Sequence, residues 1–186
     1  GVGFGDRVLI LMLNRTEFIE SFLAINKLGA IAVPVNFRMT PSEIAFLVSD
    51  CQARVVITES VLANVAAAVR DLDATLATVI VAGGDGADSA DGAATLNYED
   101  LMTAGANPPP VDIPDDSPAL IMYTSGTTGR PKGAVLTHNN LAGQAMTHLF
   151  TNGADINNDI GFIGVPLFHI AASATPSSAC SSAGRR

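Results

Sequence analysis

The stretch VLILMLNRTEFIESFLAINKLGAIAVPV, residues 8–35, decides the fold class of this chain. Val8–Leu13 is a continuous apolar run typical of a buried strand, and Ala30–Val35 is a second one. The residues between them have helical periodicity, and Gly29 ends the predicted helix. Its apolar face consists of Phe18, Phe22, Ile25 and Leu28. A strand, a helix and a strand in this order predict a parallel βαβ unit and a layered α/β fold.

Two helix starts are predicted from capping patterns. Asn14, with Glu17 three residues later, predicts a capping box at the first helix. Thr40, Pro41 and Glu43 predict the start of the next helix, because proline is favoured at the first helical position and glutamate closes the box.

The alternation of elements then continues along the chain. Val55–Thr58 is a predicted strand, Ser60–Leu72 a helix and Thr78–Val81 a strand. Residues 83–94 are almost entirely Gly, Asp and Ala, which predicts a solvated loop. Residues 105–118 contain three consecutive prolines and three aspartates, which predicts a stiff acidic connector.

This connector divides the chain. We expect a partial N-terminal α/β subdomain over residues 1–104, the connector over 105–118, a partial phosphate-loop subdomain over 119–172, and a disordered tail over 173–186. The predicted elements after the connector are strand Ala119–Tyr123, strand Ala134–Thr137, a helix from about Asn139 to Phe150, and strand Ile160–Val165.

The amino-acid composition excludes several classes of protein. At 186 residues, with 48% apolar and 15% charged residues, the chain is of globular type. A net charge of −8 argues against a nucleic-acid binder, which needs a basic face. No apolar run reaches the roughly 18 residues of a membrane span. Cys51 and Cys180 are the only cysteines, so neither a disulfide framework nor a zinc site is indicated, and the cytoplasm is the expected compartment.

The residues that suggest chemistry are concentrated in Ile121-Met-Tyr-Thr-Ser-Gly-Thr-Thr-Gly-Arg-Pro-Lys-Gly133, which begins in a predicted strand and continues as the loop after it. Glycines let the backbone approach phosphate oxygens, hydroxyls add donors, and Lys132 adds a positive charge. The stretch is not a Walker A loop, because Pro131 precedes the lysine and Gly133 follows it. The alternative is a polar hairpin turn between two strands.

Three blocks of residues resemble one family, in the family's order. Tyr123 to Gly133, with Leu136-Thr-His-Asn139 after it, is similar to the signature of the adenylate-forming superfamily. Val165-Pro-Leu-Phe-His169 resembles the acyl-pocket motif of that family. Gly5-Asp-Arg-Val8 through Asn36 resembles the N-terminal region of acyl-CoA synthetases. The resemblance runs from about residue 3 to residue 172.

The resemblance implies that a carboxylate attacks the α-phosphate of ATP with the help of Mg²⁺, and that CoA then displaces AMP. The residues implied to hold the β- and γ-phosphates are Thr124, Ser125, Gly126, Thr127, Thr128, Gly129 and Lys132. Thr124 is also the candidate for a hydroxyl near the metal. The resemblance places His169 beside the acyl carboxylate, although a histidine after an apolar run is otherwise more often a core residue. His138 is expected to be structural, either capping the following helix or bonding the loop.

The resemblance also implies that the chain is the N-terminal part of a fatty-acid CoA ligase. Some aryl-CoA ligases carry an aromatic residue two positions after the histidine, whereas Ala171 stands here, which favours a fatty acid. The open alternatives are an aryl-CoA ligase, a peptide-synthetase adenylation domain, or a non-catalytic remnant with weak or no nucleotide binding. Because composition changes abruptly after Ala172, we expect a frameshift or premature end near that codon.

Overall fold

The computed structural model describes residues 1–84, 94–103, 110–124, 130–152 and 164–169. Within these ranges seven strands form one sheet in the order β5-β4-β3-β1-β2-β6-β7. The strands are β1 (Arg7–Leu11), β2 (Ile31–Pro34), β3 (Val55–Glu59), β4 (Thr78–Ala82), β5 (Ala94–Asn97), β6 (Pro118–Thr124) and β7 (Lys132–Thr137). All neighbouring strands are parallel except the antiparallel pair β6 and β7. The predicted α/β class is confirmed.

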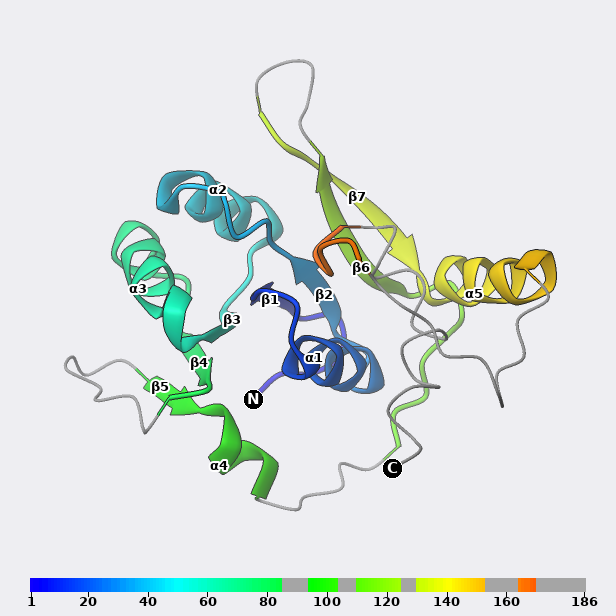
Figure 1. Ribbon diagram of the computed structural model, residues 1–186, viewed down its shortest axis with the longest axis horizontal. Coiled ribbons are helices and arrows are strands. Elements are labelled where there is room, and N and C mark those ends of the chain that lie inside the picture. Colours follow the sequence, from blue (N-terminus) through cyan, green and yellow to red (C-terminus); the bar gives the residue numbers. More distant parts are fainter. Residues whose placement is uncertain (85–93, 104–109, 125–129, 153–163, 170–186) are drawn as a thin grey trace.

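Helices cover both faces of this sheet. They are α1 (Thr16–Lys27), α2 (Pro41–Cys51), the 3₁₀ helix η1 (Ser60–Leu62), α3 (Ala63–Leu72), α4 (Tyr98–Thr103) and α5 (His138–Asn152). Figure 1 shows α2 and α3 on one side of the strands and α1 and α4 on the other. None of these helices combines the length and apolarity needed to cross a bilayer.

The continuous apolar run of β1 is explained by this layered arrangement. Successive side chains of a strand point to opposite faces. Leu9 and Leu11 therefore enter the core beneath α2 and α3, whereas Val8, Ile10 and Met12 enter the core beneath α1. A parallel strand that is buried on both faces needs no polar positions, because no face meets water.

The two predicted helix starts have different outcomes. The capping box of α2 is confirmed: the Glu43 amide donates to Thr40 Oγ1 (3.4 Å), and the Thr40 amide donates to Glu43 Oε2 (2.7 Å). The capping box at Asn14 is wrong. The N-cap of α1 is Arg15, which makes no side-chain cap, and Glu17 is instead bonded to the Arg15 guanidinium.

The end of α1 is marked by a glycine. Gly29 follows α1 with φ 69°, in the left-handed region that favours glycine. The amides of Gly29 and Ala30 donate back to Asn26 O and Ile25 O, which satisfies carbonyls at the end of the helix. The predicted end of the first helix is confirmed.

Sequence patterns missed two short elements. β5 extends the sheet beyond β4, and α4 follows it directly, although no strand or helix was predicted between residues 83 and 104. After the connector, β6 pairs with β2 in the same sheet. The strands before and after the connector thus share one sheet, and the division into subdomains at the connector stays a prediction.

The second half of the chain matches the expectations in part. β6, β7 and α5 lie where two strands and a helix were predicted. His138 does not cap α5: Thr137 and Asn140 form reciprocal bonds between side chain and amide there (3.0 and 3.2 Å). Of the strand predicted over 160–165, only residues 164 and 165 are described, and they are not in a strand. The predicted tail lies outside the described residues.

Candidate active site

One edge of the sheet collects the residues that the sequence singled out. β1, β2 and β6 are parallel, so their carboxyl ends lie at the same edge. β7 runs the opposite way and begins at that edge, where Lys132 pairs with Thr124, the last residue of β6. In α/β sheets ligands bind outside the carboxyl ends of strands, where neighbouring connections leave toward opposite faces. β1 and β2 meet this condition, because α1 and α2 lie on opposite faces.

A segment from far along the chain, residues 165–169, lies across this edge. Asn14, three residues after β1, holds it through both halves of its side-chain amide. Asn14 Nδ2 donates to the Val165 carbonyl (3.0 Å), and the Leu167 amide donates to Asn14 Oδ1 (2.8 Å). The side chain of Leu167 is buried in the core beneath α1. Figure 1 shows this segment in orange beside β2 and β6.

The same segment is also anchored to the residues after β2. The ring of Phe168 packs edge-on against Phe37, with centroids 5.5 Å apart and an interplanar angle of 81°. The guanidinium of Arg38 lies 5.5 Å from the centroid of the Phe37 ring. The His169 amide donates to the Pro166 carbonyl (3.0 Å), which turns the chain at the histidine. These contacts fix the position at which His169 enters the site.

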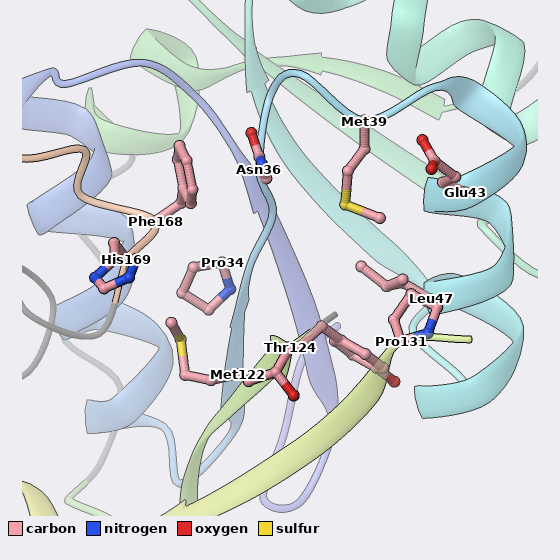
Figure 2. Close-up of a pocket in the computed structure, with 11 residues that line it drawn as sticks. Pro34, Asn36, Met39, Glu43, Leu47, Met122, Thr124, Pro131, Phe168 and His169 are labelled. Atoms are coloured by element: carbon pink, nitrogen blue, oxygen red, sulfur yellow. The ribbon is translucent and has the colours of Figure 1, made fainter. Parts of the chain in front are cut away.

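His169 and Thr124 line one pocket of about 480 Å³. Figure 2 shows Phe168 and His169 on one wall and Met39, Glu43 and Leu47 on the opposite wall, with Met122 and Thr124 between them. The remaining lining residues are Pro34, Asn36, Tyr123 and Pro131. The two predicted motifs, 45 positions apart from Thr124 to His169 in the sequence, therefore face the same space.

The polar groups around this pocket fit an anionic ligand. Thr124 Oγ1 makes only a long contact with the Lys132 carbonyl (3.5 Å), so the hydroxyl can turn to a ligand. Lys132 is exposed at the same strand end. Among the described lining residues Glu43 is the only carboxylate, and hydrogen bonds from Thr40 hold its pKa below the usual value. This carboxylate is occupied by the helix cap.

The hairpin that carries the phosphate motif is tied to α2. The Tyr123 hydroxyl donates to Asp50 Oδ2 (2.6 Å), and burial together with this bond raises the pKa of Tyr123. The Arg130 guanidinium, for which no role was predicted, lies 5.9 Å from the centroid of the Phe46 ring. Both strands are thus held near the point where the loop leaves them.

Glycine at position 133 is required by packing. A Cβ atom there would lie 2.9 Å from Ile121 Cγ2 and 3.3 Å from the Tyr123 ring. The last glycine of the motif therefore serves the close approach of the two strands.

The structure brings three of the predicted site residues together at one edge: Thr124, Lys132 and His169. The other predicted loop residues, Ser125, Gly126, Thr127, Thr128 and Gly129, lie outside the described residues. Sequence reasoning missed Asn14 as a site-edge residue. Its signal was available, because a polar residue just past the carboxyl end of a buried strand marks the ligand edge of an α/β sheet.

Comparison with known proteins identifies the protein family to which the chain belongs. Residues 1–184 match the family model described as AMP-binding enzyme, so the chain belongs to the family of AMP-binding enzymes. The match extends past Ala172, where the resemblance carried by the motifs ends.

The relatives include CoA ligases and a CoA synthase. The chain is 38% identical over 178 residues to the long-chain-fatty-acid–CoA ligase FadD13 of Mycobacterium tuberculosis, a match that covers 94% of this chain and 33% of that protein. It is 34% identical to a feruloyl-CoA synthase of an Amycolatopsis species, over 92% of this chain and 31% of that protein. The chain thus spans about a third of the length of these curated relatives.

A solved structure has the same fold. The inhibitor-bound N-terminal domain of FACL13 from Mycobacterium tuberculosis superposes with a TM-score of 0.73 at 33% identity, covering 97% of this chain and 43% of that one. The sheet of this chain therefore has the fold of the N-terminal domain of adenylate-forming enzymes.

Proposed function

We propose that the protein containing this chain activates a carboxylic acid with ATP and passes the acyl group to the thiol of CoA. The observation that carries the proposal is the pocket in which Thr124 and His169 meet, beside the strand end that bears Lys132. The carboxylate oxygen attacks the α-phosphate, and pyrophosphate leaves. The thiolate of CoA then attacks the acyl carbon, and AMP leaves.

The residues have separate roles in this proposal. Lys132 neutralises charge on the β- and γ-phosphates as pyrophosphate departs, and Thr124 contributes a hydroxyl to the same group. His169, on the other wall of the pocket, orients the carboxylate. Mg²⁺, which prefers oxygen ligands and phosphate partners, would lie on the phosphate oxygens near the Thr124 hydroxyl. Ser125 to Gly129 complete the phosphate loop.

A fatty acid is the proposed substrate, and the cytoplasm is the proposed compartment. Support for the fatty acid comes from FadD13, to which the chain is more identical than to the feruloyl-CoA synthase, and from the small residue at Ala171. The feruloyl-CoA synthase keeps an aromatic acid as the second candidate. Measuring the exchange of labelled pyrophosphate into ATP with each acid separates the two candidate substrates.

The test is acid-dependent exchange of labelled pyrophosphate into ATP, measured on the complete product of the gene that encodes these residues. A charge-assisted phosphate contact contributes about 1.5–3 kcal/mol. Lys132→Ala should therefore lower kcat/KM for ATP about 10- to 100-fold. Lys27→Ala is the matched control, because Lys27 is exposed in the last turn of α1, and it should have no effect. A Lys132→Ala rate within about twofold of the wild type would show that the loop assignment is wrong.

A further inference from the structure

We propose that Asn14 is a positioning residue for His169: its amide holds the backbone of residues 165–167 so that the histidine enters the pocket. This inference rests on the proposed function, in which His169 orients the carboxylate. It assigns a site role to a residue that capping patterns placed at a helix start.

The first support is the geometry of the amide. Asn14 uses one donor and one acceptor on two backbone groups of the same segment, at 3.0 and 2.8 Å. The partners lie 151 and 153 positions away in the sequence. This pairing resembles the exchange of hydrogen bonds between two strands. It fixes the distance of the segment from the end of β1 and the register of its residues there.

The second support is that Asn14 makes no contribution to its own helix. The N-cap of α1 is Arg15, and no side chain caps this helix. The side chain of Asn14 is thus directed away from α1 and toward the segment. A purely local role in helix formation does not explain its contacts.

The third support is the short path from Asn14 to the pocket. Leu167 receives the Asn14 contact and is buried, and the His169 amide bonds to Pro166 O in the same turn. A shift at Leu167 is therefore passed directly to His169. Misplacement of a reacting group by about 1 Å can cost roughly 100-fold in rate.

The test separates the two bonds by substitution. Asn14→Asp keeps an acceptor for the Leu167 amide but cannot donate to Val165 O, and Asn14→Ala removes both bonds. Hydrogen exchange at the Leu167 amide, followed by mass spectrometry, should be slowest in the wild type, faster in Asn14→Asp and fastest in Asn14→Ala. Asn26→Ala is the matched control, because it also removes a side-chain amide: Asn26 Nδ2 donates to the Phe22 carbonyl within α1. It should leave the exchange of Leu167 unchanged.

Activity provides the second readout. Asn14→Ala should lower kcat/KM for the acid about 10- to 100-fold while the KM for ATP stays within about twofold, because the phosphate hairpin is not touched. In a His169→Ala background, Asn14→Ala should change the rate by less than about twofold. A merely structural role would instead give multiplicative losses and would affect ATP equally.

The inference is overturned if Leu167 exchange is unchanged in Asn14→Ala, or if the losses of Asn14→Ala and His169→Ala multiply. If the wild-type protein shows no acid-dependent exchange of pyrophosphate, the proposed function fails. The protection of the Leu167 amide then still decides whether Asn14 holds the segment.

Discussion

The bond between Tyr123 and Asp50 makes the sharpest prediction about the phosphate hairpin. Tyr123→Phe removes a 2.6 Å hydrogen bond to a carboxylate and leaves the ring in place. Hydrogen bonds to charged groups contribute about 1.5–3 kcal/mol net. Asp50 is exposed and regains water, so the lower end applies: about 1.5 kcal/mol, or a fall in Tm of roughly 3–6 °C for a domain of this size.

A matched pair elsewhere in the fold provides the control. The Tyr98 hydroxyl donates to Glu20 Oε2 (3.0 Å), which ties α4 to α1 on the face away from α2. Tyr98→Phe should lower stability by a similar amount. Only Tyr123→Phe should also weaken the binding of pyrophosphate, by about three- to tenfold, because only Tyr123 anchors the strand that leads into the phosphate loop.

The assays are urea unfolding and calorimetric titration with pyrophosphate. A double-mutant cycle with Asp50→Asn should give a coupling energy of about 1 kcal/mol. Equal pyrophosphate affinity in the wild type and Tyr123→Phe, together with reduced stability, would refute the idea that this bond orders the phosphate hairpin.

Three further predictions concern the frame around the site. Gly133→Ala should lower the free energy of unfolding by about 1–3 kcal/mol, because the new Cβ would lie 2.9 Å from Ile121 Cγ2. Gly143→Ala in α5 meets open space and should stabilise the protein slightly. Equal urea midpoints for the two variants would contradict this prediction. Thr40→Ala should cost about 1 kcal/mol in urea unfolding by removing the cap of α2, and an unchanged midpoint would show that the cap is dispensable. Burial raises the pKa of Tyr98 to about 12 from 10.0, so the folded state favours the protonated phenol. The resulting stability is complete below pH 10 and is lost as the pH rises toward 12; Tyr98→Phe should flatten this loss, and an unchanged slope would argue against it.

Local signals explain what the sequence predicted well. The cap at Thr40 was predictable because donor and acceptor lie three residues apart, and the end of α1 because glycine alone adopts φ 69° without strain. The buried strand β1 was predictable because both of its faces are apolar.

Long-range pairing explains what the sequence did not predict. Asn14 looks like a helix cap locally, and only the fold brings residues 165–167 to it. Strand β5 has four residues and lacks a strong apolar run, so its pairing with β4 defines it. The place of β6 beside β2 likewise depends on the sheet as a whole.

The most direct measurement of the central claim follows the oxygen atoms of the acid. The complete gene product is incubated with ATP, CoA, Mg²⁺ and a long-chain fatty acid labelled with ¹⁸O in its carboxylate, and AMP is analysed by mass spectrometry. If the carboxylate attacks the α-phosphate at the edge formed by Thr124, Lys132 and His169, one ¹⁸O appears in AMP, and Lys132→Ala strongly slows its appearance while Lys27→Ala does not. Unlabelled AMP, or labelled AMP formed at the wild-type rate by Lys132→Ala, would contradict this site and its chemistry.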